Sequence, residues 1–554
     1  MEKSAANNMG RVLIVILLAQ FIIVIDSTFM NVSISTLVKD FHTTVTSIQN
    51  AITLYTLVMA AFMIAGAKFG DIIGRKRAFT LGLTVYAVGT TITSLSPTLP
   101  VFIFGWSLLE GLGAALMLPA MMSLIVANFP AGPPRAKAYA SFAAIAGIAA
   151  GVGPIIGGLF TTYLSWRLAF FSELIVAGYI FWQRRIIADA PYEGPKPTFD
   201  WTGFSFCAIG LATLVEGIIL ASSYGLFVTR TAFIVAGTTL LPAGAISPTV
   251  ILVLLGLIIL AAFAAIEVRK SHLHHDTLVD ISLFKIRTVR AGSTAQLVQN
   301  LLTNGVIFAI SLYLQMALAY NAIRSGIALL PLSIAVLLSA GLSTRYISKL
   351  LAPKIAVLGG FVTVGLGAIA LGLTARHATS GSSFIIGLAL IGLGLGAIAS
   401  QNQNLIMSSV SQEQSNETSG IINTALNIGS SLGTSLAGAF ILSVFVATAT
   451  GLVNQNTTFT ASQKTQLNSA VTANAQIVSN AQLQAATAKL QPAQQQAILN
   501  INSEARSKSL STVYFGLGLF SLVGILAALR LPLTKPLAAS SSQPSPAPAA
   551  AKRA

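Results

Sequence analysis

Residues 66–77 read Gly66-Ala67-Lys68-Phe69-Gly70-Asp71-Ile72-Ile73-Gly74-Arg75-Lys76-Arg77 and join two long apolar stretches. Glycine has no Cβ, so the three glycines allow a short connection to lie close against two helices. Asp71 and Arg75 are four positions apart, which brings their side chains within reach of one another. The stretch therefore predicts a tight, charged loop between two apolar helices.

The composition around this loop describes a protein embedded in lipid. Of the 554 residues, 54% are hydrophobic and only 9% are charged, whereas roughly 25% are charged in an average soluble protein. So few charges cannot cover a soluble surface, which excludes an ordinary soluble enzyme, a disordered chain and a disulfide scaffold. The chain has one cysteine, Cys207, and no G-x-x-x-x-G-K-[ST] phosphate loop, so no ATPase motif is present.

Fourteen apolar stretches are long enough to cross a bilayer, which takes roughly 20 helical residues. They cover residues 11–34, 48–69, 78–96, 101–126, 138–160, 168–187, 202–222, 250–266, 291–318, 325–345, 354–374, 383–408, 419–449 and 512–530. With the N-terminus inside, more than two thirds of the 32 lysines and arginines lie in inner loops, as the positive-inside rule requires. We therefore expect an even number of spans and both termini in the cytoplasm. Residues 11–34 lack a small-residue cleavage site and are expected to remain as the first helix.

The segments between these stretches divide the chain. We predict a six-helix bundle over residues 1–187, two inserted helices and a charged linker over 188–290, a second six-helix bundle over 291–535 and a disordered tail over 536–554. Residues 226–246 are interrupted by Arg230 and Pro242, which favours a re-entrant or surface hairpin over a fifteenth span. The outer loop 450–510 is rich in Ala, Gln and Asn, and the spacing of its few apolar residues predicts a short helical hairpin.

Two apolar stretches carry small or polar residues in a recognisable order. The fifth contains two G-x-x-x-G pairs, which let helices pack closely, and a proline, which removes a helical hydrogen bond and predicts a kink. These residues are Gly147, Gly151, Gly153, Pro154, Gly157 and Gly158. The first apolar stretch ends in Ile25-Asp26-Ser27-Thr28-Phe29-Met30-Asn31-Val32.

These motifs resemble those of the major facilitator superfamily. Residues 66–77 are similar to its motif A, residues 153–158 to its antiporter motif C, and residues 26–32 to the D-x-T-x-x-N-V pattern of its drug:proton antiporter branches. The resemblance, with fourteen spans, implies an all-α membrane fold of two six-helix bundles plus two inserted helices. It also implies that motif A latches the cytoplasmic side closed through Gly70, Asp71, Gly74, Arg75, Lys76 and Arg77. The alternatives are a loop that only sets topology and, for motif C, a stripe that only packs.

Four carboxylic acids lie inside predicted spans: Asp26, Glu110, Glu173 and Glu216. A bare carboxylate at the bilayer centre costs at least about 2.5–3.5 kcal/mol, so each must face a cavity, pair with a neighbour or stay protonated. A carboxyl that takes a proton on one side and releases it on the other meets the physical requirement for proton coupling. Asp26 and Glu110 lie on helices that line the cavity in the resembling family and are our candidates for this role. A structural hydrogen bond is the alternative for each.

The other two acids are secondary candidates. Glu173 follows Arg167, and an ion pair at the outer surface is its alternative role. Glu216 lies on one of the inserted helices, which usually sit beside the transport core. Ser107 stands where the family usually has arginine, so the arginine-linked proton pathway of the family has no counterpart at this position.

The candidates for the wall of a substrate cavity are neutral. They are Asn31, Tyr55, Trp106, Gln299, Asn304 and Tyr313. The amides either line a wet cavity or bond helix to helix, and the aromatic rings either stack on a flat or cationic ligand or pack. His272, His274, His275 and Asp276 lie in a flexible charged loop, so no metal site and no cofactor is expected.

The sequence thus predicts a proton-coupled antiporter that exports amphipathic or cationic drug-like compounds by alternating access. The alternatives are an exporter of a lipid or a specific metabolite, and a non-transporting membrane sensor on the same scaffold. No residues support an enzyme. We expect a monomer in a cytoplasmic membrane, with a small organic substrate, protons and lipid as partners. Nucleic acid is not expected, because inner loops account for the net charge of +16.

Overall fold

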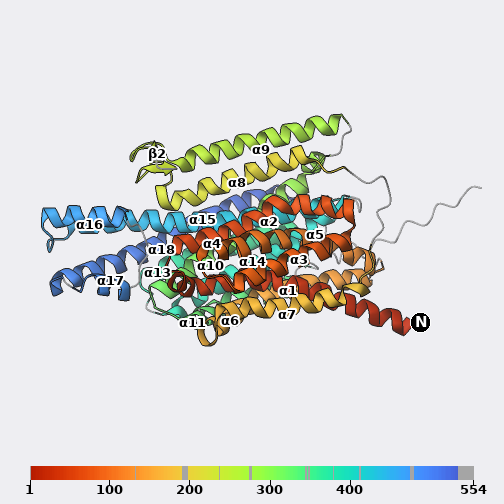
Figure 1. Ribbon diagram of the computed structural model, residues 1–554, viewed down its shortest axis with the longest axis horizontal. Coiled ribbons are helices and arrows are strands. Elements are labelled where there is room, and N and C mark those ends of the chain that lie inside the picture. The colour runs from red at the N-terminus through yellow and green to blue at the C-terminus, as the bar shows by residue number, and fades with distance from the viewer. Residues whose placement is uncertain are drawn as a thin grey trace, which may run out of the picture.

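The computed structural model describes residues 2–130, 133–189, 198–235, 238–273, 277–343, 346, 350–378, 380–410, 414–473, 480–488 and 490–533. The candidate metal ligands His274, His275 and Asp276 and the tail predicted from residue 536 lie outside these ranges. The long helices lie side by side along one axis (Figure 1).

The first half of the chain contains α1 (Glu2–Asp40), α2 (Val45–Ile73), α3 (Arg75–Ser94), α4 (Leu99–Phe102), the π-helix η1 (Ile103–Glu110), α5 (Gly111–Asn128), α6 (Pro133–Tyr163), α7 (Trp166–Gln183), the 3₁₀ turn η2 (Arg184–Ile186), α8 (Trp201–Tyr224), β1 (Phe233–Val235), β2 (Thr238–Leu241) and α9 (Pro248–His272). The second half contains η3 (Ile281–Lys285), α10 (Arg287–Met316), α11 (Ala322–Leu342), α13 (Pro353–Ala375), η5 (Gly381–Phe384), α14 (Ile385–Met407), α15 (Ser415–Gln455), α16 (Ala461–Ala473), α17 (Asn480–Ala486) and α18 (Pro492–Leu529).

Twelve helices in the described residues are long and apolar enough to cross a membrane. Each of the fourteen predicted stretches falls on a helix. The two that are not among the twelve are α3 and α7, which have 20 and 18 residues and carry charged or hydroxyl side chains. The multi-pass membrane fold is confirmed, whereas the count of fourteen spans stays a prediction at α3 and α7.

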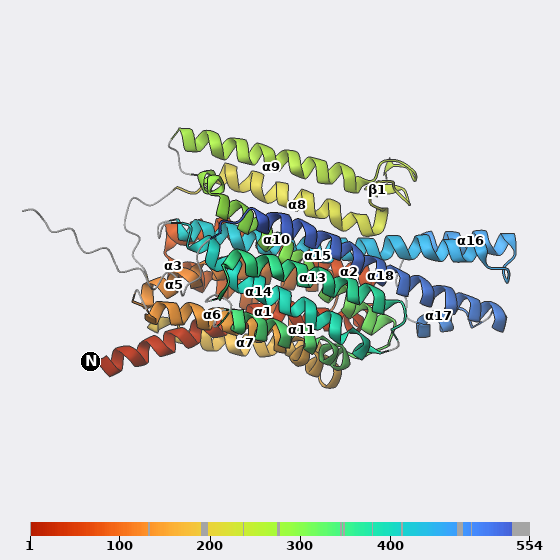
Figure 2. The same cartoon turned by 180° about the vertical axis from the view of Figure 1, so that it is seen from behind.

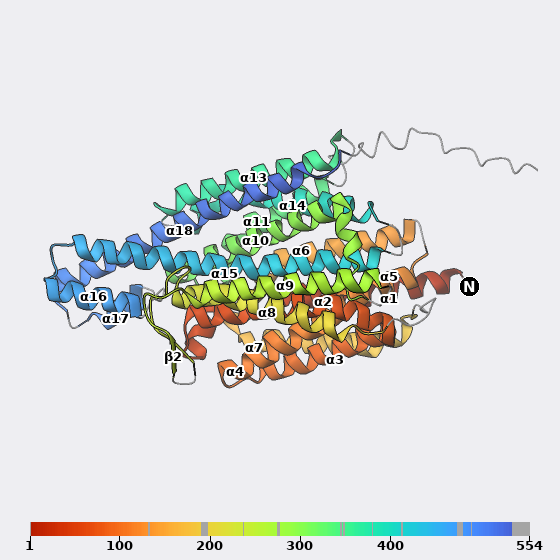
Figure 3. The same ribbon diagram turned by 90° about the horizontal axis from the view of Figure 1, so that it is seen from above.

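The helices form two bundles with α8 and α9 beside them. Helices α1 to α7 pack on one another, and so do α10, α11, α13, α14, α15 and α18. The bundles meet where α2 contacts α15 and α6 contacts α11 (Figure 3). Helices α8 and α9 pack together at the edge, with α8 against α2 and α15 (Figure 2). Only 11% of the most apolar stretch of α9 is buried, so most of this helix faces outward, where lipid would cover it.

Segment 226–246 is a hairpin at the end of the molecule that also carries α16 and α17 (Figure 1). Its strands β1 and β2 pair antiparallel, and a further bridge joins Val228 to Ile246. At the same end, α15 and α18 run beyond the bundle, and α16 and α17 lie in the predicted outer loop. A small core that includes Phe445, Val453 and Phe459 holds this outer segment together.

At the opposite end, one acidic residue ties the inserted helices to each other. Asp200 caps α8 by accepting a hydrogen bond from the Gly203 backbone N–H (2.8 Å) and pairs with the ammonium of Lys270 on α9. Burial favours the neutral form of this carboxyl, but the hydrogen bonds from Lys270 and Gly203 outweigh it and lower the pKa of Asp200 below its ordinary value.

Candidate functional site

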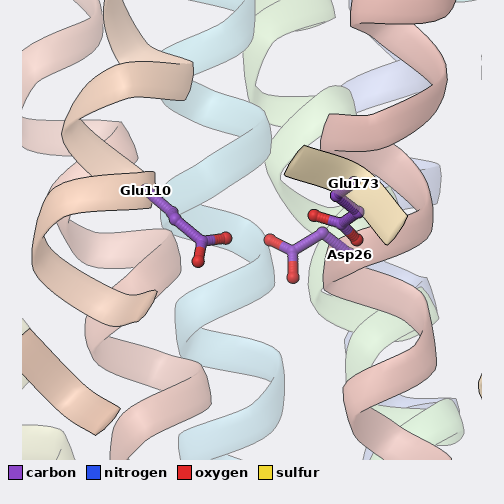
Figure 4. Close-up of side chains that lie close together, drawn as sticks. All are labelled: Asp26, Glu110 and Glu173. Carbon is purple, nitrogen blue, oxygen red and sulfur yellow. The ribbon is translucent and has the colours of Figure 1, made fainter. Parts of the chain in front are cut away.

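Three carboxylates from three helices meet in the core of the first bundle (Figure 4). Asp26 lies on α1, Glu110 is the last residue of η1, and Glu173 lies on α7. One carboxylate oxygen of each lies within 4.8 Å of the other two. The side chains are 0%, 0% and 5% exposed. The structure therefore brings together both primary candidates and one secondary candidate, and we call the three residues the acid cluster.

Two members of the acid cluster accept a hydrogen bond from an aromatic side chain. The indole Nε1 of Trp106 donates to Asp26 Oδ1 (2.8 Å), and the hydroxyl of Tyr86 donates to Glu173 Oε2 (2.7 Å). An indole N–H can only donate, so Asp26 is held by a group that suits an ionised carboxylate.

The third member, Glu110, is held differently. Its Oε1 lies 2.9 Å from the hydroxyl oxygen of Thr93, which also lies 2.8 Å from the carbonyl oxygen of Gly89. A hydroxyl has one proton to donate, and a carbonyl can only accept. When the Thr93 hydroxyl donates its proton to the Gly89 carbonyl, it can only accept from Glu110. The contact between Thr93 and Glu110 is then a hydrogen bond only if Glu110 carries a proton and donates it. This geometry suits a neutral Glu110.

Among the described residues, no base neutralises the acid cluster. None of the three ion pairs among the described residues includes a cluster member. The titratable groups that act on the three carboxyls are one another and the hydroxyls of Tyr55 and Tyr86. At an effective dielectric constant of about 20, two negative charges 4.8 Å apart repel by about 3.5 kcal/mol. We therefore expect no more than one of the three carboxyls to be ionised unless a cation is bound.

The π-helix η1 aims two of these groups into the core. It spans eight residues and ends at Glu110, and such segments are rare and frequent at functional sites. The ring of Trp106 in η1 stacks on Tyr55 of α2, with centroids 4.9 Å apart and planes within 4°. The lack of a side chain at Gly89 makes room, because a Cβ there would lie 2.8 Å from Glu110 Cγ.

The glycine-rich face of α6 connects α1 to the second bundle. A Cβ on Gly153 would overlap the hydroxyl of Thr28, and one on Gly157 would overlap Phe29, both close to Asp26 on α1. On its other side, α6 presents Gly147, Gly151 and Gly158 to α11. The stripe therefore packs both within the first bundle and between the bundles.

Hydrogen bonds join the bundles in the half that leads to α16 and α17. The side chain of Gln315 on α10 accepts from the Ser35 backbone N–H and donates to the Asn31 carbonyl, each at 2.9 Å. Gln49 on α2 donates to the carbonyl of Thr434 on α15 (3.2 Å). The two bundles are thus held together at this end, and Asn31 takes part through its backbone.

The loop at the opposite end has the predicted internal ion pair. Arg75 Nη2 lies 2.7 Å from Asp71 Oδ1. Gly74 has φ +98°, a conformation that favours glycine, and Lys76 donates to Asp189 through its backbone N–H (3.0 Å). A pocket beside the loop is lined by residues of α2, α5 and α15, and it includes Glu417.

The remaining candidates lie elsewhere. Glu216 is on the exposed face of α8, outside the acid cluster. Gln299 donates to the Leu395 carbonyl (3.3 Å) and Asn304 to the Ser430 hydroxyl (2.9 Å), so both bond helix to helix, one of the two roles left open. Tyr313 lies in the second bundle and donates to the Ala378 carbonyl (3.1 Å).

Arg167, the alternative partner of Glu173, pairs instead with Asp40 (3.4 Å). Positions 167 and 173 are six apart on α7, and six residues place two side chains on different faces of a helix. This spacing was the available signal that the ion pair would not form. Sequence reasoning also missed Tyr86, Thr93 and Gln315, whose roles depend on contacts between separate helices.

Two helical bundles packed about a shared interface, with buried acids and broken helical geometry inside the membrane, define a secondary transporter. The sequence model of the Major Facilitator Superfamily matches residues 16–200 and 201–434, and the chain belongs to this family. It is therefore a transporter rather than an enzyme.

Several curated relatives match most of the chain. It is 26% identical over 441 residues to the "Tetracenomycin C resistance and export protein" of Streptomyces glaucescens, and the match covers 78% of this chain and 76% of that protein. It is 27% identical over 430 residues to the "Puromycin resistance protein pur8" of Streptomyces alboniger, covering 76% and 80%. It is 25% identical over 434 residues to the "Multidrug efflux pump LfrA" of Mycolicibacterium smegmatis, covering 78% and 81%.

Solved structures show the same fold. The crystal structure of a bacterial homolog of the human lysosomal transporter Spinster, inward-facing and unoccupied, superposes with a TM-score of 0.59 at 14% identity. The match covers 95% of this chain and 98% of that one. At this identity the similarity concerns the fold alone.

Proposed function

We propose that the protein is a proton-coupled antiporter that exports amphipathic or cationic drug-like compounds across the cytoplasmic membrane. The acid cluster carries the proposal, because three buried carboxyls without a base form a site that binds protons or a cation. The names of the relatives, which describe resistance, export and multidrug efflux, support a drug-like substrate.

In this mechanism, Asp26 is the group that changes charge, with Glu110 beside it. The ionised Asp26 attracts a cation next to the rings of Tyr55 and Trp106. These rings stack on each other and are buried in this conformation, so a flat aromatic cation would reach them only when the helices around the cluster move apart. A proton that enters from the outside neutralises the carboxylate and removes the attraction, so the cation leaves. Exchange of one proton for one monocation moves no net charge, so the pH gradient rather than the potential drives it. One unit of pH difference supplies about 1.4 kcal/mol, which concentrates the cation roughly tenfold.

The bundle contacts supply the alternating access. Opening toward α16 and α17, the proposed outer side, requires the hydrogen bonds of Gln315 and Gln49 to break. The motif A loop with its Asp71–Arg75 pair lies at the proposed cytoplasmic end, where it would close the transporter in that outward-open state. The glycine stripe on α6 contacts both bundles and is a suitable surface for their relative movement.

Purified protein in proteoliposomes with an imposed pH gradient tests the proposal. Ethidium, a flat monocation, should accumulate when the gradient is present and redistribute when a protonophore collapses it. If folded protein accumulates no member of a panel of organic cations, the cationic-drug proposal is wrong, and lipids and specific metabolites become the substrates to examine. A protein that moves none of these would be a sensor.

A further inference from the structure

The acid cluster contains more carboxyls than the exchange of a single proton requires. It also contains buried polar atoms whose hydrogen bonding is incomplete within the part of the chain that the structure describes. The hydroxyl of Tyr55, Oδ2 of Asp26 and Oε2 of Glu110 are buried and complete no hydrogen bond of standard geometry among the described residues, although Tyr55 lies close enough to Asp26, and Thr90 close enough to Glu110, to interact with them. The Tyr55 side chain is 1% exposed, and its hydroxyl acts electrostatically on both Asp26 and Glu110. These oxygens are the ones that a bound cation would contact.

The hydrogen bonds rank the three carboxyls as proton donors. Asp26 faces the indole N–H of Trp106, which can only donate, so Asp26 ionises first. Glu173 accepts from the Tyr86 hydroxyl and can ionise second. Glu110 has threonine hydroxyls beside it, and a hydroxyl can accept as well as donate. We therefore assign the retained proton to Glu110, which can donate it to Thr93 while Thr93 donates to the Gly89 carbonyl.

We propose that the three carboxyls and Tyr55 form a charge-matching cation site, in which each positive charge on the substrate displaces one proton. The empty cluster holds three protons and is neutral. A monocation leaves two protons and the carboxylate of Asp26, and a dication leaves one proton and the carboxylates of Asp26 and Glu173. The displaced protons pass to water on the side to which the site is open. This inference rests on the proposed cation transport and adds that the substrate class includes dications.

The groups that face the cluster support a site in which the charges of protons and substrate together balance those of the carboxylates. Tyr55 on α2 and Tyr86 on α3 are the other titratable groups that act on the carboxyls, and no lysine, arginine or histidine of the described residues does so. The substrate would therefore supply the positive charge that balances the ionised carboxyls. The Asp26–Trp106 contact keeps one carboxylate next to the stacked rings, where an aromatic cation would lie.

Proton release on binding tests the proposal with two dyes that share one ring system. Ethidium carries one positive charge and propidium carries two. Each is titrated into purified wild-type protein in weakly buffered detergent solution, and a pH indicator reports the protons released per dye bound. We expect one proton for ethidium and two for propidium. Equal release for the two dyes would overturn the proposal.

The variant Glu173→Gln tests the second position. The amide oxygen can still accept from Tyr86, so ethidium should bind as before with one proton released. Propidium should release one proton instead of two and bind about tenfold more weakly. Glu504→Gln, the same chemical change on the exposed surface of α18, is the matched control and should alter neither dye. An equal effect of Glu173→Gln on both dyes would contradict the assignment.

Different results would contradict the antiporter proposal and the charge-matching proposal. If both dyes accumulate in proteoliposomes and each releases one proton, the antiporter proposal stands and charge matching is wrong. If neither dye binds or releases a proton from folded protein, the proposed cation transport is itself wrong.

Discussion

Trp106 and Asp26 are 80 positions apart in the chain, yet the indole Nε1 donates to the carboxylate Oδ1 at 2.8 Å. The same kind of bond recurs near the end of α1, where Trp166 donates to Asp40 Oδ2 at 2.7 Å. The first aspartate is completely buried, and the side chain of the second is 40% exposed. The same substitution can therefore be made in each pair, which compares one kind of hydrogen bond in a buried and in a partly exposed position.

The substitution Asp26→Asn should abolish gradient-driven uptake of ethidium, reducing it by at least about tenfold. The amide oxygen preserves the bond from Trp106, so the packing should survive while the titratable group is lost. Uptake into proteoliposomes at a fixed pH gradient measures the effect, with Asp40→Asn as the control that keeps most of its activity. Uptake that survives in Asp26→Asn would move the coupling role to Glu110.

The substitution Trp106→Phe should weaken ethidium binding by about tenfold. A phenyl ring preserves the stack on Tyr55 but leaves Asp26 without its donor, and an unsatisfied buried polar group costs about 1–3 kcal/mol. Equilibrium binding in detergent measures the change. Trp166→Phe removes the corresponding bond at Asp40 and should leave ethidium binding within a factor of about two. Equal losses in the two variants would mean that the indoles matter only for packing.

The substitution Gly157→Ala should destabilise the protein, because the new methyl group would overlap Phe29 on α1. Overpacking of this kind costs about 1–3 kcal/mol. Thermal unfolding in detergent, followed by size-exclusion profiles, measures the loss. Gly178→Ala on α7 is the control, since a Cβ at Gly178 meets nothing within 4 Å. A variant Gly157→Ala as stable as Gly178→Ala would show that the α1–α6 contact is looser than described.

Contacts between residues close in the chain were predictable from the sequence, and contacts between distant segments were not. Asp71 lies near the end of α2 and Arg75 begins α3, on either side of the turn at Gly74, and their separation of four residues was enough to predict that they could pair. Hydropathy placed the helices for the same reason, since each span is a property of one continuous segment. The glycine stripe on α6 was visible as a pattern, but only the structure shows that α1 and α11 lie against it.

The acid cluster depends on the rotation of three helices about their own axes. A soluble helix reveals its rotation through one polar face, whereas a membrane helix is apolar on most sides and carries little such signal. The position of Glu110 also depends on η1, whose π-helical hydrogen bonds change the direction of the side chains that follow. For these reasons Asp26 and Glu110 could be chosen as candidates, but their approach to Glu173 could not be derived.

The substitution Gln315→Ala should favour opening at the end that carries α16 and α17. It removes the two hydrogen bonds that this side chain makes with α1, each worth about 1 kcal/mol net. A cysteine at Thr53, buried between the bundles in wild type, should then react about tenfold faster or more with an impermeant maleimide. The background carries Cys207→Ser, and Gln495→Ala on α18 is the matched control. An unchanged labelling rate would show that these bonds do not hold the bundles closed.

The substitution Asp200→Asn should reduce thermal stability near neutral pH, and the difference from wild type should shrink in acid. Asparagine still caps α8, so the variant keeps the cap and removes the charge that pairs with Lys270 and acts on Glu267. Because folding lowers the pKa of Asp200 from its ordinary value of 3.8, its stabilising contribution is complete above that value and is lost as the pH falls through the lower, folded pKa. Melting curves in detergent from about pH 6 to about pH 3 measure the trend. A difference that stays constant over this range would exclude the ion pair as its source.

Helices α15 and α18 have 41 and 38 residues, whereas a membrane needs roughly 20. Both belong to the second bundle, and their extensions are braced by α16 and α17 (Figure 3). From Ser435, which bonds to Thr53 across the bundle interface, to the end of α15 at Gln455, the helix extends about 30 Å. Because the extension is long and belongs to the second bundle, a small tilt of that bundle would displace the tip of the extension by a larger distance. A fluorophore attached to α16 would therefore report the movement of the second bundle during transport.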